Sequence, residues 1–320
     1  MTKNGILCEV NEKRVFLDPK TTDTVGINFV SHAHSDHLPS KNGGTILSSV
    51  ETNEISNLRG FKMENHVQCL DDFSLVDSGH ILGAKGLLFD DIFYTGDICT
   101  RNRGFLHGAK IPKCKTLITE CTFGLPEFIF PKLDEIKKQV NELISSLYGK
   151  GIPVILMGYQ LGKAQTLTQL FGHWGPLFLH DSVKEMNLLH QKFGISLNDG
   201  IGHTEAEKNG LLEKKPWIMI APMLSSKNKF IVNMKSKYGA ITIGFSGWVQ
   251  SKQFSFGRRA DYSIPMSDHC DFEELVDLVI QSGAEQVYTI HGFLDEFAEH
   301  VRKIGISAQP LLENSLDNFT

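Results

Sequence analysis

The stretch VSHAHSDHLPS, residues 30–40, places three histidines and one aspartate within eleven positions, at the end of a short apolar run. In an extended chain alternate side chains point to the same side, so His32, His34 and Asp36 can converge, and a turn would bring His37 to join them. Imidazole and carboxylate groups together suit Zn²⁺, with Mn²⁺ or Fe²⁺ as alternatives. Because one tetrahedral ion does not need so many groups from one short segment, the stretch predicts two metal ions.

The composition is that of an ordinary globular protein. The 320 residues are 41% hydrophobic and 22% charged, with a formal net charge of −5. This acidic balance argues against a whole-surface nucleic-acid binder, although it is compatible with a local basic groove. No apolar run reaches the ~18 residues that a membrane span requires, and the chain does not start with the apolar core of a signal peptide. We therefore expect a cytoplasmic protein with no membrane partner.

The cysteines predict neither a zinc ribbon nor a disulfide framework. They are far apart in the sequence and form no C-x-x-C pair. We expect reduced thiols at all six positions, which are Cys8, Cys69, Cys99, Cys114, Cys121 and Cys270.

The pattern of apolar residues changes once along the chain. About 125 residues of short strand-like runs, separated by Gly, Asn and Asp turns, precede a segment in which helical and Val/Ile-rich runs alternate. The first helix of that segment is predicted at 132–148, with Gly149 as its stop. Such alternation indicates a parallel α/β sheet, and the length favours two domains. We therefore predict that an α/β module over 126–245 is inserted into a β-rich domain over 1–125 and 246–320.

Further polar groups follow other predicted strands. SGHILGA (78–84) supplies His80 and YTGDICTRNRG (94–104) supplies Asp97. Since loops at strand ends can meet at one site, these groups are candidates to complete the metal centre.

Together these motifs resemble the metallo-β-lactamase superfamily. LITECTFGLP (117–126), IPMSDHCDFEEL (264–275) and VYTIHGF (287–293) resemble motifs A, B and C of its β-CASP nucleases. The whole pattern is most similar to the branch of ligase-associated DNA exonucleases and mRNA 3′-end processing factor-like proteins. The resemblance implies an αβ/βα sandwich with an inserted α/β cap of the β-CASP type.

The resemblance also implies residue roles. One ion would be bound by His32, His34 and His80 and the other by Asp36, His37 and His291, with Asp97 between them and Asp18 behind the histidines. Two divalent ions, most simply Zn²⁺ with Mn²⁺ as the alternative, would activate a hydroxide for attack on phosphorus. His269 would be the general acid and Glu120 would orient it, so the predicted catalytic residues are His269, Glu120, Asp36 and Asp97.

Basic and hydroxyl residues further along the chain are candidates for strand contacts. Such runs usually lie on solvated faces, but near a phosphodiester-cleaving site they would neutralise the backbone. The candidates for nucleic-acid binding are Ser225, Ser226, Lys227, Lys229 and Arg258.

These inferences favour a DNA exonuclease of DNA repair, acting on single-stranded DNA or DNA ends with a DNA ligase or helicase as partner. An RNA-processing nuclease, either a 3′-end endonuclease or a 5′–3′ exoribonuclease, is the main alternative. A small-molecule metallo-hydrolase and a non-catalytic scaffold subunit fit less well. The hydrolase would not need the inserted cap, Glu120 or the pair of His269 and His291. A scaffold subunit would have lost metal ligands, whereas every expected ligand is present here.

Overall fold

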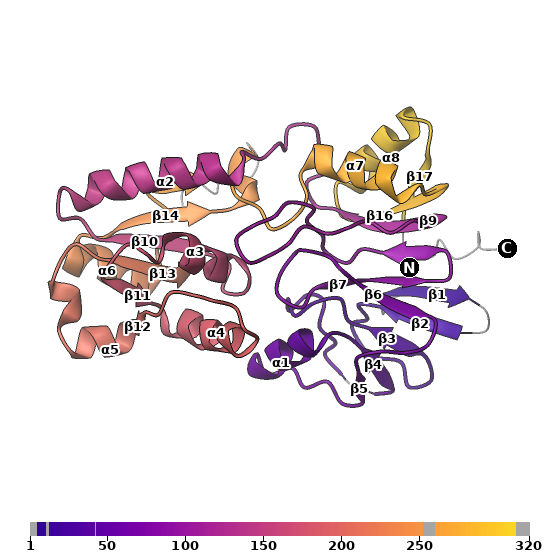
Figure 1. Ribbon diagram of the computed structural model, residues 1–320, viewed down its shortest axis with the longest axis horizontal. Coiled ribbons are helices and arrows are strands. Elements are labelled where there is room, and N and C mark those ends of the chain that lie inside the picture. Colours follow the sequence, from indigo (N-terminus) through magenta and orange to yellow (C-terminus); the bar gives the residue numbers. More distant parts are fainter. Residues whose placement is uncertain (1–4, 11–12, 42, 252–259, 312–320) are drawn as a thin grey trace. The chain divides into compact units, whose positions relative to one another are not determined.

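The computed structural model describes residues 5–10, 13–41, 43–251 and 260–311, which form two compact units (Figure 1). Unit 1 comprises Met1–Asn102, Leu106–Pro126 and His269–Thr320, and unit 2 comprises Arg103–Phe105 and Glu127–Asp268. The sequence analysis places the second boundary at 245, whereas residues 246–268 cluster with unit 2. The reason is that a strand within them extends the sheet of unit 2. That unit 1 is the catalytic domain and unit 2 the cap domain stays a prediction.

Unit 1 contains two sheets. The five-stranded sheet has its strands in sequence order, with an antiparallel first pair and parallel pairs after it. Its strands are β1 (Ile6–Val10), β2 (Lys13–Leu17), β3 (Ile27–Phe29), β4 (Thr45–Leu47) and β5 (His66–Val67).

The second sheet of unit 1 has six strands and mixed pairing, antiparallel from β6 to β8 and parallel from β8 to β17. In spatial order the strands are β17 (Ser307–Pro310), β16 (Gln286–Gly292), β9 (Thr116–Cys121), β8 (Ile92–Tyr94), β7 (Lys85–Phe89) and β6 (Phe73–Asp77).

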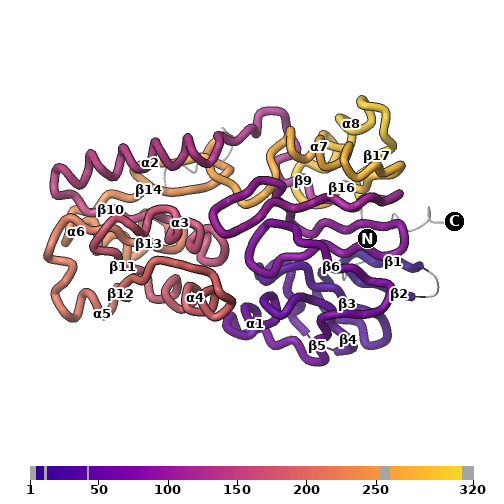
Figure 2. Tube along the Cα trace, viewed as in Figure 1, coloured from indigo at the N-terminus to yellow at the C-terminus, as the bar shows by residue number. Residues whose placement is uncertain are grey.

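The two sheets of unit 1 share one apolar core. Phe29 of the first sheet and Tyr94 and Ile118 of the second belong to the same buried cluster. Phe93 and Leu117, one position earlier in β8 and β9, point to the opposite face because side chains alternate along a strand. There they pack with helices α7 (Phe272–Ser282) and α8 (Leu294–Lys303). Helix α1 (Val50–Leu58) lies beside the five-stranded sheet in both ribbon and tube views (Figures 1 and 2). This arrangement confirms the predicted α/β sandwich.

Unit 2 is a parallel sheet covered by helices on both faces. Its strands, in spatial order, are β12 (Ile201–Gly202), β11 (Leu177–Leu179), β13 (Ile218–Pro222), β10 (Val154–Gly158), β14 (Ile241–Phe245) and β15 (Tyr262–Ile264). The intervening helices are α2 (Leu133–Tyr148), α3 (Lys163–Phe171), α4 (Asp181–Lys192), α5 (His203–Lys208) and α6 (Lys229–Tyr238). Two 3₁₀ turns complete it, η1 (Leu211–Glu213) and η2 (Gly247–Gln250).

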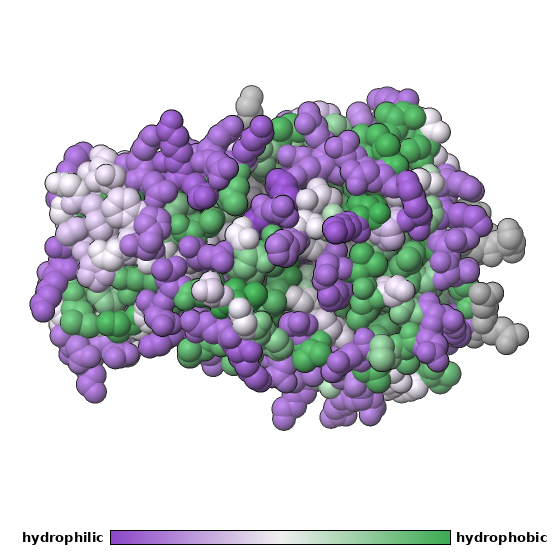
Figure 3. All heavy atoms as spheres, viewed as in Figure 1, coloured by the Kyte–Doolittle hydropathy of each residue, from purple (hydrophilic) through white to green (hydrophobic). Residues whose placement is uncertain are grey.

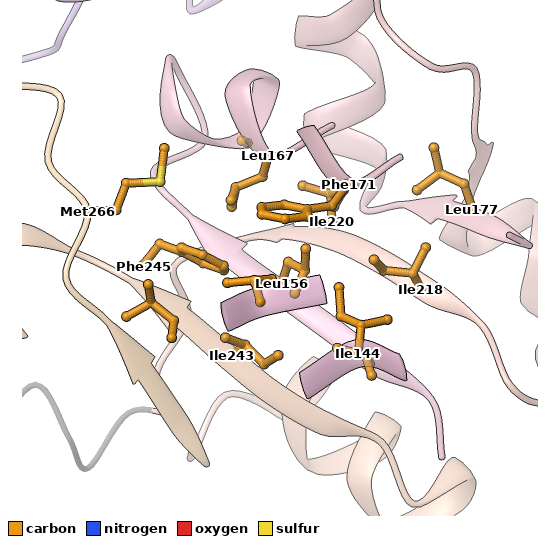
Figure 4. Packing of buried hydrophobic residues seen from close by; sticks show 14 of the residues in the cluster. Ile144, Leu156, Leu167, Phe171, Leu177, Ile218, Ile220, Ile243, Phe245 and Met266 are labelled. Atoms are coloured by element: carbon orange, nitrogen blue, oxygen red, sulfur yellow. The ribbon is translucent and has the colours of Figure 1, made fainter. Parts of the chain in front are cut away.

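Both faces of this sheet are apolar, as the continuous Val/Ile-rich runs predict for a parallel sheet. On one face Ile144 of α2 and Phe171 of α3 pack with Leu156 of β10 (Figure 4). On the other face Met219 of β13 packs with Met234 of α6. Helix α2 buries its apolar stripe and ends at the predicted Gly149, and hydrophilic atoms predominate over its outer side (Figure 3).

All six cysteines are free thiols, five of them buried. Within the described ranges, the structure has no helix with the length and apolar character of a membrane span.

Candidate metal centre

The structure brings together His32, His34, His80 and Asp97, with one ligand atom of each lying within 4.8 Å of the others. His32 and His34 lie in the loop after β3, His80 in the loop after β6 and Asp97 in the loop after β8. Three separate strand ends of unit 1 therefore meet at this point. Their side chains are buried except that of His34, which is partly exposed.

The spacing of these atoms suits a tetrahedral ion. His34 Nδ1 lies 3.1 Å from both His32 Nε2 and His80 Nε2, and Asp97 Oδ2 lies 3.4 and 3.6 Å from the same two nitrogens. Ligands about 2.0–2.1 Å from a zinc ion would be about 3.3 Å from one another at the corners of a tetrahedron. A single imidazole nitrogen also cannot form good hydrogen bonds to two others in this arrangement. The donor set therefore fits a bound divalent metal ion.

Asp18 fixes the orientation and tautomer of two of the histidines. Its carboxylate accepts hydrogen bonds from Ser31 N (2.7 Å), Ser31 Oγ (2.6 Å), His37 Nδ1 (2.7 Å) and the Tyr94 hydroxyl (2.7 Å). Because the Ser31 hydroxyl donates to Asp18, it accepts from His32 Nδ1 at 2.9 Å. Both His32 and His37 then carry their proton on Nδ1 and turn the Nε2 lone pair toward the centre.

The candidate ligands of a second ion lie on the other side of Asp97. His37 Nε2 is 3.5 Å from Asp97 Oδ1, whereas His32 approaches Asp97 Oδ2. Asp36 Oδ2 lies 3.8 Å from His37 Nε2, and the ring of His291 lies 5.4 Å from that of His37. His291 is exposed, at a bulge near the end of β16, with a φ of 52°. The two oxygens of Asp97 thus face the two candidate sets.

The electrostatics of the centre favour a cation. Burial alone would lower the pKa of His37, but Asp97 and Asp18 raise it to about 10. Burial lowers the pKa of His32 and of His80, which keeps both imidazoles neutral. Asp97 is buried as well, yet the neighbouring histidines hold its pKa well below the usual range, so it stays a carboxylate. Neutral imidazoles and ionised carboxylates are the forms that bind metals, so a metal ion at the centre would displace the Nε2 proton that His37 holds without one.

Glu120 and His269 form a pair next to this centre. Glu120 is the buried second-last residue of β9, and its Oε1 accepts from His269 Nδ1 at 2.7 Å and from Ile98 N at 2.9 Å. Its Oε2 accepts from Thr122 N at 3.2 Å. Nδ1 of His269 is therefore the nitrogen that Glu120 holds, and Nε2 is the one on the other side of the ring. Asp97, Glu120 and His269 offer ligand atoms within 4.8 Å of one another, so the pair borders the metal centre.

The main-chain position of His269 has its own support. Two residues later, Asp271 caps α7 by accepting from Glu274 N at 3.0 Å, while Glu274 accepts from Asp271 N at 2.9 Å. This is the capping box that the sequence DFEE encodes. Arg101 donates to the carbonyl oxygen of His269 at 2.6 Å and forms an ion pair with Glu274. The loops after β8 and before α7 are thereby tied together.

A glycine is required between two parts of the site. Gly96 precedes Asp97 and has a φ of 56°, and a Cβ atom there would lie 2.7 Å from the Cβ of Ser31. Since Ser31 holds His32, the absence of a side chain at Gly96 lets the two loops approach closely.

The candidate nucleic-acid residues lie in unit 2. Ser225, Ser226, Lys227 and Lys229 are exposed in the segment before and at the start of α6. Arg258 lies outside the described residues. A role in strand binding stays a prediction for all five.

The sequence analysis missed three residues that support the centre. Ser31, Tyr94 and Arg59 contact either Asp18 or the loop of ligands. The adjacency of Ser31 to His32 was an available signal, whereas Tyr94 and Arg59 are brought in only by tertiary folding.

Comparisons with known proteins agree with this geometry. A protein of Opitutus terrae named "Probable DNA ligase" is 26% identical over 90% of this chain, and the match covers 29% of that protein. Endoribonuclease YSH1 of Gibberella zeae is 27% identical over 44% of the chain and 20% of its own length. The chain thus spans less than a third of either relative.

A solved structure of a protein of unknown function from Enterococcus faecalis V583 has the same fold. It superposes with a TM-score of 0.62 and 14% identity, covering 98% of this chain and 96% of the other. A comparison with models of protein families gives no match. The ligand motif, the sandwich that carries it and these relatives together support the resemblance of the chain to the β-CASP branch of the metallo-β-lactamase superfamily.

Proposed function

We propose that this protein is a metal-dependent nuclease, and specifically a DNA exonuclease of DNA repair. The observation that carries the proposal is the position of Asp97. Its two carboxylate oxygens face two sets of histidines, while the Glu120–His269 pair stands beside it. Two cation sites and an adjacent proton carrier are the groups that hydrolysis of a phosphodiester requires.

The residues fit two divalent ions. His32, His34 and His80 would bind the first, Asp36, His37 and His291 the second, and Asp97 would bridge them. Imidazole-rich ligation with few carboxylates favours Zn²⁺, and Mn²⁺ is the alternative. When bound, such ions act as Lewis acids on the phosphate and lower the pKa of a coordinated water.

The protein's own groups then divide the remaining work. Asp18, through its contacts to Ser31 and His37, keeps the Nε2 lone pairs of two histidines directed at the centre. Glu120 holds Nδ1 of His269, so Nε2 of His269 delivers a proton to the departing oxygen. Both steps depend on burial, since Asp18 and Glu120 have 7% and 1% of their side chains exposed and water does not compete for them.

The relatives decide between DNA and RNA only in part. The similarity to the protein named "Probable DNA ligase" extends over 90% of this chain and supports DNA as substrate and a DNA ligase as partner. A helicase partner stays a prediction. The similarity to Endoribonuclease YSH1 extends over 44% and supports RNA processing as the second candidate. We favour DNA because the longer match includes both units.

A direct comparison of substrates tests the proposal. End-labelled single-stranded DNA and RNA of the same sequence are incubated with the protein in Zn²⁺ or Mn²⁺, and the products are sized over time. We expect mononucleotides or short products from DNA, faster than from RNA. Cleavage of RNA alone would replace the DNA proposal with the RNA-processing one, and cleavage of neither would refute a nuclease.

Metal analysis tests the site separately. We expect about two ions per chain at saturation, because the candidate ligands outnumber the four that one tetrahedral ion takes. His34→Ala should abolish cleavage without unfolding the protein. A limit of one ion per chain under saturating metal would refute the two-ion arrangement.

A further inference from the structure

Arg59 places a guanidinium group beside the loop of metal ligands. It is the C-cap residue of α1, and its Nη1 donates a hydrogen bond to the carbonyl oxygen of Ala33. Ala33 lies between His32 and His34, so Arg59 reaches the main chain of two candidate ligands. The side chain is only partly exposed, which means that its charge has lost much of its water.

The protein does not neutralise this charge with a carboxylate. Within the described ranges, Arg59 forms its hydrogen bond to Ala33 and no ion pair, and the nearest negative group that acts on it is Asp36. Burial lowers the pKa of Arg59, and Asp36 compensates only in part. Arg101 differs, because Glu274 pairs with it directly and raises its pKa despite deeper burial. A partly buried cation without a paired anion gains free energy when an anionic ligand binds to it, because the ligand replaces the water that burial has removed.

Arg59 also acts on a candidate ligand that is open to solvent. His32 and His80 are buried, and the side chain of His37 is 3% exposed, whereas that of Asp36 is 78% exposed. Since Arg59 interacts with Asp36, a strand that approaches the metal ligands from solvent would pass the guanidinium.

We propose that Arg59 binds a backbone phosphate of the nucleic-acid strand, next to the phosphate that is cleaved. The inference rests on the proposed nuclease function and assigns it a phosphate subsite in unit 1. With one N–H group held by Ala33, the planar guanidinium still has N–H donors to grip a phosphate in a bidentate manner. The bond to Ala33 holds the side chain in place, which lowers the entropy cost of binding.

Binding of single-stranded DNA by Arg59→Gln tests this subsite without any need for cleavage. The affinity is measured by fluorescence anisotropy for the full chain loaded with metal, in a His269→Ala background so that the strand persists. Hydrogen bonds to charged groups are worth about 1.5–3 kcal/mol, so we expect roughly a ten- to hundredfold loss of affinity. The slope of log affinity against log salt should fall by about 0.7, the value for one phosphate of a single strand.

A scan with neutral phosphates locates the contact. Single methylphosphonates are placed at successive positions of the strand. One position should weaken binding to the Arg59 protein and have no further effect on Arg59→Gln, because the two changes remove the same interaction. The matched control is Arg302→Gln in the same unit, whose guanidinium also donates to a backbone carbonyl, that of Ala308 at 2.7 Å. This control should bind DNA as the unaltered protein does.

Three outcomes would overturn the inference. The first is unchanged affinity and salt slope in Arg59→Gln. The second is a methylphosphonate scan in which the loss of affinity at every position simply adds to the loss caused by Arg59→Gln. The third is loss of metal from Arg59→Gln by elemental analysis, which would show that Arg59 only holds the loop at Ala33. If the protein with Arg59 binds no nucleic acid, the proposed function itself fails, and the two failures are thereby distinguished.

Discussion

Replacing Asp18 with Asn should weaken the binding of the second metal ion and leave the fold intact. Asp18 has a φ of 44°, a left-handed conformation that Asn accepts readily, so the backbone is not strained by the change. The amide keeps one oxygen but replaces the other with an NH₂ donor. At the Oδ2 position that donor would meet His37 Nδ1, which now donates there at 2.7 Å, and at the Oδ1 position it would meet the N–H of Ser31. The first orientation moves the His37 proton to Nε2, where it would face Asp97 in place of a lone pair, and the second displaces Ser31, which holds His32; in both, the negative charge behind His37 is lost.

The size of the effect follows from the four hydrogen bonds that Asp18 accepts. Loss of a carboxylate behind a metal-binding histidine typically lowers metal affinity 10- to 100-fold, or about 1.4–2.7 kcal/mol. Asp18 supports both His32, through Ser31, and His37. We therefore expect the upper end of that range, about 100-fold, for the ion bound by His37, and a smaller loss for the other.

Competition with a chelator of known affinity measures both ions, and circular dichroism and Tm report whether the fold persists. The control is Asp72→Asn, which also removes one carboxylate from unit 1 but breaks only a surface ion pair with Lys13. It should bind both ions normally. If the Asp18→Asn protein binds two ions with unaltered affinity, then Asp18 does not set the tautomer of His37 as a metal ligand.

Three other predictions concern different parts of the molecule. His269→Ala should lose about 10²–10⁴-fold in turnover on ordinary DNA and much less on a nitrophenyl phosphodiester, with metal content unchanged, because an activated leaving group needs no proton; loss of metal would instead make His269 a ligand. Lys227→Ala combined with Lys229→Ala should reduce the salt slope of DNA binding by about 0.7 for each phosphate contact removed, and an unchanged slope would exclude these lysines from the strand path. Burial holds the pKa of His190 at about 4, below its unfolded value of about 6.5, so the unfolded chain binds more protons between these values. Stability in urea should therefore fall as pH drops from 6.5 to 4, less steeply in His190→Gln, and equal slopes would contradict the buried neutral imidazole.

The sequence predicted much of the fold because its local signals agree with the tertiary structure. The helical spacing over 132–148 corresponds to α2, and the alternation of helices and apolar runs corresponds to the parallel sheet of unit 2. Helix α8 was not predicted, since its apolar stripe is short, with Phe297, Ala298 and Val301 as its buried residues.

Some residues of the metal centre could be predicted from local sequence and others could not. His32, His34, Asp36 and His37 are close in sequence, so their spacing alone suggested a metal site. The pairing of Glu120 with His269 joins residues 149 positions apart and was expected only through family resemblance. Hydrogen bonds such as that of Tyr94 to Asp18, across 76 positions, depend on how two sheets pack and leave no local pattern.

The close approach at Gly96 limits how this sequence can diverge. Even the methyl group of alanine at this position would meet Ser31, and at a φ of 56° it would strain the backbone as well. The displaced Ser31 would release His32 from Asp18, although the substitution adds no charge and touches no ligand. Substitutions at position 96 are therefore selected against, although they change no metal ligand and would look neutral if only the ligands were compared. A paralogue with every histidine intact but a side chain at that position is a candidate for lost metal binding.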